Sequence, residues 1–285
     1  RDLRLSGIVF TGSTNTAWHI NQQLALRKGA LIPFIAETGG QNAMIVDSTA
    51  LAEQVVADVI ASIFRSAGQR CSSLRVLYLQ EEIFDKVTTM LKGAMLELKV
   101  GNPIQIDTDV GPVIDANAQK GLYQHLAWLD QHGQKICKLD LTEVCKEGYF
   151  VPPSVYEIQS MEQLKQENFG PILHVIKFAR KNLDRVLHEI ENSGFGLTLG
   201  IHSRIDETIA YITHKARVGN IYVNRNMIGA VVGVQPFGGE RLSGTGPKAG
   251  GPNYIPRLAT ERTVSINTTA AGGNASLMAL NDDTI

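Results

Sequence analysis

The chain has 285 residues, of which 44% are hydrophobic and 19% are charged, a composition that suits a globular protein with a sizeable core. The formal net charge is −1 at pH 7 and the basic residues are scattered, so charge gives no reason to expect nucleic acid or an anionic membrane as a partner. The 3 cysteines fit neither a secreted disulfide framework nor a zinc site. They indicate a reducing compartment, which we take to be the cytoplasm.

The two ends of the chain bear on targeting and completeness. The first residues lack the long apolar run of a signal peptide, and no stretch approaches the roughly 18 uninterrupted apolar residues of a membrane-spanning helix. The chain begins with Arg1 in place of an initiator Met and opens on the lead-in to a strand. We therefore expect a fragment of a longer protein.

In the first third of the chain, short apolar strands alternate with helical patterns. In chain order we expect a strand at 8–11, a helix from 14 to about 28, strands at 31–36 and 43–46, a helix at 51–65, a strand at 74–79 and a helix at 82–98. Pro33 places the second of these strands at an edge or an irregular position, because proline cannot donate a ladder hydrogen bond.

The same alternation continues through the rest of the chain. We expect a helix at 115–132, strands at 134–138 and 172–178, a helix at 182–192, a strand at 198–202, a helix at 205–216 and a strand at 220–224. This order predicts a mostly parallel α/β sheet with right-handed crossovers. Residues 229–252 are rich in glycine and indicate a structured loop, and residues 263–267 alternate like an exposed strand.

Cys71 is the candidate nucleophile. It lies in a polar segment between a helix and a strand, where a thiol can be partly exposed among backbone N–H groups. A thiol with an ordinary pKa of about 8.5 becomes a useful thiolate beside a cation or a helix N-terminus, and Arg70 is the preceding residue. Gly68 permits unusual backbone torsions. The alternative is a buried structural cysteine, the usual role of a free cysteine and the one we expect for Cys137 and Cys145.

Glu37 is the candidate general base. It ends a strand and is followed by Thr38 and two glycines, Gly39 and Gly40, a position at which α/β sheets place their sites. A glutamate can serve as a base near neutral pH if burial raises its pKa. The alternative is that this segment only shapes a turn.

A second strand-turn-helix segment suits a phosphate group. Gly12 and Ser13 follow the first strand and precede a helix, whose N-terminus presents free N–H groups and a positive dipole end to an anion. The segment is not the glycine fingerprint of a Rossmann turn, and a serine in such a place is often only a helix cap.

Taken together, these motifs resemble the aldehyde dehydrogenase superfamily, and they occur in the family's order along nearly the whole chain. They are FTGS at Phe10–Ser13, ExGG at Glu37–Gly40, GQxC at Gly68–Cys71, Gly101-Asn102-Pro103, Gly111-Pro112, Glu167–Pro171, and Pro236–Gly239 with Ser243-Gly244. The resemblance implies an aldehyde dehydrogenase-like α/β fold: the end of a Rossmann-type NAD-binding domain, an α/β catalytic domain and a C-terminal oligomerisation strand.

The resemblance also implies roles for individual residues. Cys71 would attack an aldehyde to form a thiohemiacetal, hydride transfer to NAD would leave a thioester, and Glu37 would activate the water that releases the acid. Glu167 is similar to the family's glutamate that contacts the nicotinamide ribose, and Phe169 would pack near the nicotinamide. The residues implied in cofactor binding are Gly12, Ser13, Glu37, Gly39, Glu167 and Phe169.

The sequence departs from the family's pattern at two substituted positions and by the absence of one region. Ala17 stands where glycine is usual, and Thr38 stands where leucine is common. The family's earlier half, with the first Rossmann strands, the lysine at the adenosine ribose and the asparagine of the oxyanion site, is not in this sequence.

Residues beside Cys71 point to a carboxylated aldehyde. Arg70 and Ser72 flank the nucleophile, and Gly250 and Gly251 offer backbone N–H groups in a later loop, a combination that can bind a carboxylate. This arrangement resembles the L-glutamate γ-semialdehyde (pyrroline-5-carboxylate) dehydrogenase branch of the family. The alternative is that Arg70 only activates Cys71 and the glycines only shape the loop.

Within that branch, residues 243–252 and the tail at 263–274 resemble bacterial bifunctional enzymes that join a flavin-dependent proline dehydrogenase to this dehydrogenase. FAD would then belong to a domain upstream of this chain. The strand at 263–267 would pair with a neighbouring subunit in a homo-oligomer, since an unpaired edge is an association hazard.

We expect three parts: residues 1–38 as the remnant of the NAD-binding domain, 39–246 as the catalytic domain, and 247–285 as the substrate-anchor loop, oligomerisation strand and tail. Three other functions stay open at this point. They are an aldehyde dehydrogenase for another aldehyde, a folded fragment without activity, and a cysteine hydrolase, for which no histidine lies in a suitable motif.

Overall fold

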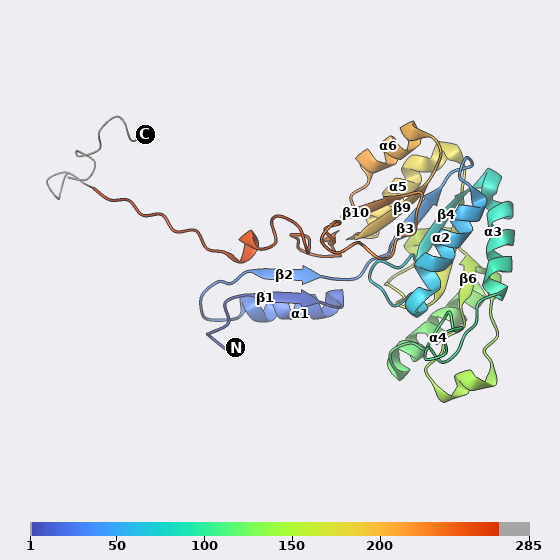
Figure 1. Cartoon of the computed structure of the whole chain (residues 1–285), viewed down its shortest axis with the longest axis horizontal. Helices are drawn as coiled ribbons and strands as arrows, with labels where there is room; N and C mark the ends of the chain where they lie inside the picture. Colours follow the sequence, from blue (N-terminus) through green and yellow to red (C-terminus); the bar gives the residue numbers. More distant parts are fainter. Residues whose placement is uncertain (1, 268–285) are drawn as a thin grey trace.

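The computed structural model describes residues 2–267. Its N-terminal unit consists of β1 (Ile8–Thr11), α1 (Thr14–Ala25) and β2 (Phe34–Glu37). The two strands pair in parallel, with Thr11 opposite Glu37, and the unit projects from the main body (Figure 1). Its position is consistent with the expected remnant of a larger sheet.

The main body is a seven-stranded sheet in the order β10-β9-β3-β4-β7-β6-β5, in which every pairing is parallel except that of β5 with β6. This confirms the predicted α/β class. The strands are β3 (Ala43–Val46), β4 (Val76–Gln80), β5 (Gln134–Lys138), β6 (Ser154–Glu157), β7 (Ile172–Phe178), β9 (Thr198–His202) and β10 (Asn220–Val223).

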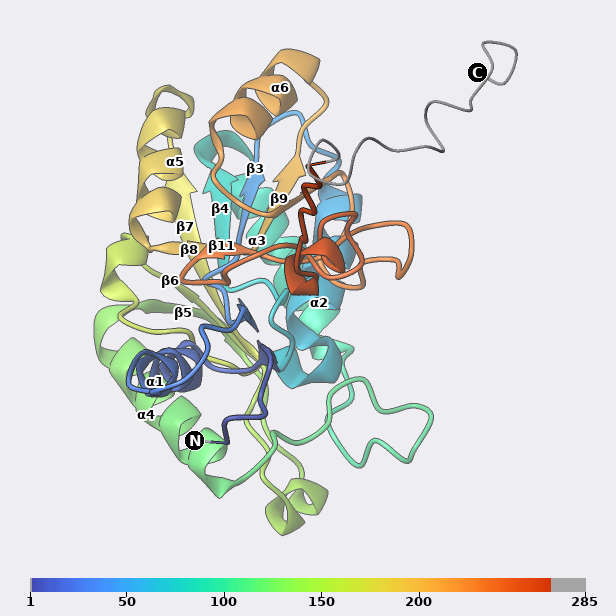
Figure 2. The same cartoon turned by 90° about the vertical axis from the view of Figure 1, so that its left-hand side faces the viewer.

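Helices cover both faces of this sheet (Figure 2). The helices α2 and α3, which pack together, follow β3 and β4, from which the chain moves toward the β5 edge of the sheet. The helices α5 and α6 follow β7 and β9, from which the chain moves toward the β10 edge. Since both kinds of crossover are right-handed, the two pairs of helices lie on opposite faces. The helices are α2 (Ala52–Phe64), α3 (Glu81–Leu96), α4 (Ala116–His132), α5 (Leu183–Asn192) and α6 (Asp206–Lys215). Short 3-10 turns lie at η1 (Arg65–Gly68), η2 (Glu143–Glu147), η3 (Met161–Gln163), η4 (Arg180–Asn182) and η5 (Pro256–Leu258).

The core lies between the sheet and these helices. Strands β3, β4 and β9 are buried at every position, as is usual for parallel strands covered on both faces. Each buried aliphatic side chain contributes roughly 1.5–3 kcal/mol to stability. The sheet is therefore a rigid platform for the loops at its edges.

The structure differs from the sequence prediction in a few segments. β2 starts after Pro33, whose carbonyl accepts a hydrogen bond from Ile8 N–H, and Leu31 is exposed. β6 was not expected, because two prolines precede it and hide its short apolar run. The glycine-rich loop is structured as predicted, and it also contains β11 (Glu240–Arg241), which pairs with β8 (Phe195–Gly196).

Residues 263–267 do not form a strand within this chain, and Val264 and Ile266 are exposed. The expected strand therefore has no intrachain sheet to join. The part of the tail from residue 268 onward, which carried some of the family resemblance, lies outside the described residues. No helix in the described range is both long enough and apolar enough to cross a bilayer.

Candidate active site

The loop that carries Cys71 has an unusual backbone. It leaves α2 through η1, where Ser66 and Ala67 adopt φ values of 55° and 51° and Gly68 adopts 67°. A Cβ on Gly68 would lie 2.3 Å from the carbonyl oxygen of Gly170. Glycine is therefore required here both for the torsion and for the close approach of two loops.

The thiol of Cys71 is partly buried among polar groups. Burial raises its pKa, and the nearby carboxylates of Glu167 and Glu37 raise it further, while the N–H groups of Ser72 and Cys71 itself act in the opposite direction. Arg70, the cation expected to stabilise a thiolate, is exposed, and its Nε donates to Ser66 Oγ at 3.1 Å. Because the pKa of the thiol is raised, a nearby base that accepts its proton would favour ionisation.

Glu37 provides a suitable base in the same neighbourhood. Its Oε2 accepts a hydrogen bond from Gly239 N–H at 3.2 Å, and its buried Oε1 has no hydrogen-bond donor among the described residues. Burial raises the pKa of Glu37 to about 7, against the opposing effects of the Gly239 N–H and the Lys248 ammonium. A carboxylate with this pKa can accept a proton near neutral pH.

Asn42 links the segment after Glu37 to the nucleophile loop. Its amide Nδ2 donates to the carbonyl of Cys71 at 2.6 Å and to that of Ser73 at 2.8 Å, and its Oδ1 accepts from Thr198 N–H at 3.2 Å. The sequence analysis missed this residue. Its signal was an amide side chain two positions after the glycine pair, at the start of a buried strand.

Glu167 approaches the same segment from the other side. A Cβ on Gly39 would lie 1.9 Å from Glu167 Oε2, so glycine leaves room for the carboxylate. Burial raises the pKa of Glu167, whereas Arg75 and the Gly40 N–H lower it. Arg75 forms an ion pair with Glu167 at 3.2 Å and stacks over the ring of Phe169 at 5.1 Å. The sequence analysis also missed Arg75, which lies four positions after Cys71.

Gly12 and Ser13 lie close to Glu37 along the edge of β1 and β2. Gly12 N–H donates to the carbonyl of Glu37 at 3.1 Å. Ser13 caps α1, with its side chain accepting from Thr16 N–H at 3.2 Å. The first turn of α1 has no acidic residue, so nothing there repels an anion.

The predicted substrate residues are only partly brought together. Ser72 is buried beside the nucleophile. Gly250 has a φ of 72°. Its loop is held by an antiparallel bridge between Ala249 and Phe237, and Phe237 lies two positions before Gly239, whose N–H binds Glu37. Among the described residues, neither Gly250 nor Gly251 forms a hydrogen bond with Arg70.

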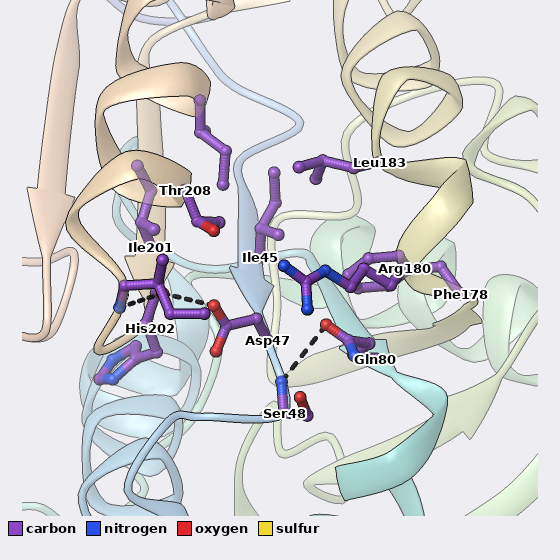
Figure 3. Close-up of a pocket in the computed structure, with 13 residues that line it drawn as sticks. Ile45, Asp47, Ser48, Gln80, Phe178, Arg180, Leu183, Ile201, His202 and Thr208 are labelled. Carbon is purple, nitrogen blue, oxygen red and sulfur yellow. Dashed lines mark hydrogen bonds between the residues drawn. The ribbon is translucent and has the colours of Figure 1, made fainter.

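A hollow lined by both polar and apolar side chains (Figure 3) lies at the opposite end of the parallel strands from Cys71. It is lined at the carboxyl ends of β3, β4 and β9, whereas Cys71 precedes the amino end of β4. Asp47 in this hollow accepts hydrogen bonds from Thr49 N–H, Thr49 Oγ1 and Ser203 Oγ. Its carboxylate is thus satisfied within the protein, and the hollow is separate from the candidate site.

Comparison with known proteins shows which family the chain belongs to. The model of the aldehyde dehydrogenase family matches residues 1–264. The bifunctional protein PutA of Klebsiella aerogenes is 55% identical over 269 residues, which are 92% of this chain and 20% of that protein.

Two solved structures are similar in fold. A variant of Bradyrhizobium japonicum proline utilization A superposes with a TM-score of 0.90 at 56% identity, covering 94% of this chain and 27% of that one. A 1-pyrroline-5-carboxylate dehydrogenase from Thermus with bound NAD gives a TM-score of 0.83 at 31% identity, covering 90% and 50%. This chain thus spans about a fifth of the PutA relative and half of the Thermus enzyme. It belongs to the aldehyde dehydrogenase family.

Proposed function

We propose that this chain contributes the nucleophile and the general base to an NAD-dependent dehydrogenase that oxidises L-glutamate γ-semialdehyde to L-glutamate in proline catabolism. The observation that carries the proposal is the shared neighbourhood of Cys71, Glu37 and Glu167, in which both carboxylates act on the thiol. The similarity to proline utilization A and to 1-pyrroline-5-carboxylate dehydrogenase supports the choice of substrate.

The chemistry follows from the protonation states of the site. Glu37, with its pKa raised to about 7, accepts the thiol proton, and Cys71 Sγ attacks the aldehyde carbon to form a thiohemiacetal. The N–H groups of Cys71 and Ser72 lie close to the sulfur and are available to stabilise the developing oxyanion. Glu37 then loses the thiol proton to solvent, and after oxidation to the thioester its carboxylate removes a proton from the water that releases the carboxylic acid.

The residues present fit NAD as the cofactor. The N-terminus of α1 with Gly12 and Ser13 would hold the pyrophosphate, and the buried Glu167 carboxylate, for which Gly39 leaves room, would accept hydrogen bonds from the nicotinamide ribose. Phe169, which is 41% exposed, would pack against the nicotinamide. NAD, when bound, supplies the hydride acceptor of the reaction.

Substitution of Cys71 tests the nucleophile. In the full-length protein, Cys71→Ala should abolish NADH formation from glutamate semialdehyde, while Cys137→Ala should keep it, because Cys137 is buried elsewhere in the core. NADH absorbance measures both. Normal turnover by Cys71→Ala would falsify the assignment.

Arg70, Ser72, Gly250 and Gly251 are the proposed carboxylate-binding residues of the substrate pocket. Arg70→Ala should raise KM for carboxylated aldehydes by about tenfold or more, the usual effect of losing a charge-assisted hydrogen bond, with little change for uncharged aldehydes. Arg65→Ala, an exposed arginine of η1, is the matched control. An equal effect on both aldehyde classes would favour a different substrate.

The arrangement of the whole protein is also a proposal. Residues 1–38 would complete an NAD-binding domain, most of which would come from a part of the full-length protein outside residues 1–285. Residues 39–246 would form the catalytic domain, and residues 247–285 would carry the anchor loop and the oligomerisation strand. A proline dehydrogenase domain with FAD would lie upstream, in a homo-oligomer in the cytoplasm. The free thiols of the 3 cysteines suit that reducing compartment.

A further inference from the structure

Arg75 is a fully buried cation next to the proposed nucleophile. None of its side chain is exposed to solvent, although a charged group is seldom buried unless it is paired and hydrogen-bonded. Arg75 itself lies outside the family motifs found in the sequence. Its contacts therefore call for a specific explanation.

The guanidinium binds both ends of the segment that leads to Cys71. Nη1 donates to the carbonyl of Gly68 at 2.7 Å, and Nη2 donates to the carbonyl of Arg70 at 3.2 Å. Nη2 also lies 3.2 Å from Glu167 Oε1. One planar group thus connects the nucleophile loop to the carboxylate proposed for cofactor binding.

The backbone of Arg75 is itself held firmly. Its N–H donates to the carbonyl of Asn42 at 2.9 Å, and its carbonyl accepts from the N–H of His174 at 3.0 Å. The same carbonyl lies 2.8 Å from Nδ1 of His174, whose Nε2 is 2.7 Å from Nε2 of His125 on α4. Because the side chain starts from this fixed point, the position of its guanidinium is well determined.

We propose that Arg75 is a positioning residue, whose guanidinium holds the Cys71 loop and the Glu167 carboxylate in one arrangement and offsets the negative charge beside the thiol. The catalytic meaning of this role rests on the proposed aldehyde oxidation. Electrostatics agree with the geometry: burial and Glu167 both raise the pKa of Cys71, and the charges of Arg75 and Cys71 stabilise one another.

Alkylation of Cys71 tests the proposal without substrate or cofactor. The full-length protein is treated with iodoacetamide from about pH 6 to about pH 11, a range that extends well above the ordinary thiol pKa because burial raises the pKa of Cys71, and mass spectrometry follows the Cys71 peptide. Arg75→Met should raise the midpoint by about one pH unit, which is about tenfold slower labelling at neutral pH. An unchanged midpoint in a folded variant overturns the proposal.

The other two cysteines of the chain report whether each variant is folded. Cys137 and Cys145 are each 5% exposed, so their peptides stay unlabelled unless the protein opens. Tyr78→Phe is the matched control, since it removes a buried hydrogen bond from β4, the strand that begins directly after Arg75, to Glu189 at 3.0 Å, away from the Cys71 loop. Its midpoint should equal that of the wild type, and a shift as large as that of Arg75→Met would assign the effect to general destabilisation.

Glu167→Gln decides the case if Arg75→Met does not fold. Removing the carboxylate leaves the Arg75 cation uncompensated beside the thiol, so the midpoint should fall. An unchanged or higher midpoint overturns the proposal. Failure of the proposed substrate would leave these results intact, because labelling needs no aldehyde.

Discussion

At the scale of single residues, the reactivity of this site depends on how burial changes two protonation equilibria. Desolvation raises the pKa of Cys71 and raises that of Glu37 to about 7. Because Glu37 acts in its carboxylate form, that form becomes populated as pH rises through about 7. We therefore expect aldehyde oxidation to increase across neutral pH and to lose this pH-dependent limb in Glu37→Gln.

Lys248 offers a direct test of this assignment. Its ammonium lowers the pKa of Glu37, so Lys248→Met should move the rising limb to higher pH and reduce kcat/KM at neutral pH by about two- to threefold, the effect of a shift of a fraction of a unit. The pH profile of kcat/KM measures the change, with Lys215→Met on α6 as the control. A limb that stays in place or moves to lower pH would show that another group limits the rate.

Gly39 tests the fit between the ExGG segment and Glu167. Since an added Cβ would lie 1.9 Å from Glu167 Oε2, Gly39→Ala must displace that carboxylate, and we expect NAD affinity to fall by about tenfold or more, as for the loss of a charge-assisted hydrogen bond. Calorimetric titration with NAD gives the dissociation constant.

The control for this substitution is Gly93→Ala in α3. Nothing lies within 4 Å of a Cβ added there, so it should leave NAD affinity unchanged and stabilise the helix by roughly 0.5–1 kcal/mol. Equal NAD affinity in Gly39→Ala and the wild type would contradict the proposed role of Glu167.

At the scale of elements, Asn42 connects β3, the nucleophile loop and the start of β9. Asn42→Ala removes two donors to loop carbonyls and the acceptor of Thr198 N–H. Leaving buried backbone groups unsatisfied costs about 1–3 kcal/mol each, so we expect the free energy of unfolding to fall by at least about 2 kcal/mol.

Urea unfolding measures the stability of Asn42→Ala, with Asn192→Ala at the exposed end of α5 as the control. The rate at which iodoacetamide labels Cys71 should also differ between Asn42→Ala and the wild type, because the loop that carries Cys71 loses the hydrogen bonds from Asn42. A free energy of unfolding equal to that of the control would mean that the other contacts of the loop, among them those of Arg75 and Gln69, hold it without Asn42.

The histidine pair between α4 and β7 predicts a loss of stability in acid. Burial lowers the pKa of His125 to about 4, and burial together with His125 lowers that of His174 to about 3. In the unfolded chain both titrate at about 6.5, so below that pH protons bind the unfolded chain preferentially. Stability should be full above about pH 6.5 and fall as pH drops toward about 4.

Thermal unfolding across this pH range measures the effect. His125→Phe, which cannot take up a proton, should make the slope of stability against pH shallower. A slope equal to that of the wild type would assign the acid sensitivity to other groups. The main alternative is His202, whose pKa is also lowered by burial and whose Nε2 lies 3.4 Å from Asp58 Oδ2.

At the scale of the whole molecule, two regions expose apolar surface that the seven-stranded sheet cannot cover. Val9 on β1 is 52% exposed, and Val264 and Ile266 near the C-terminal end are 72% and 77% exposed. Alternating exposed apolar residues in an extended segment are prone to pair with another chain. We therefore expect oligomerisation to depend on the segment around residues 264–266.

If the proposed oligomer forms through this segment, the substitutions Val264→Lys and Ile266→Lys together should reduce it to smaller species. Sedimentation velocity measures the change, and Leu96→Lys, an exposed leucine at the end of α3, is the control. An unaltered sedimentation coefficient in the double variant would place the subunit interface elsewhere.

The sequence by itself determined the local features that depend on nearest neighbours along the chain. Apolar periodicity located β3, β7 and β9, because strands buried on both faces are continuous apolar runs. It also located β5, which is only partly buried. It did not locate β6 behind its two prolines, nor β8 and β11, which are too short to leave a pattern. The motifs identified Cys71 and Glu37 as candidates, because each of these reactive residues has glycine within three positions of it in the sequence.

Only the tertiary structure decided which groups act on those candidates. It placed the buried side chain of Arg75 against the Cys71 loop and Glu167, left Arg70 exposed, and showed Asn42 bonded to the nucleophile loop. These contacts join residues far apart in the chain, and the pKa of Glu37 depends on how much water its surroundings exclude. Burial and long-range pairing are properties of the folded chain, so no local pattern in the sequence could supply them.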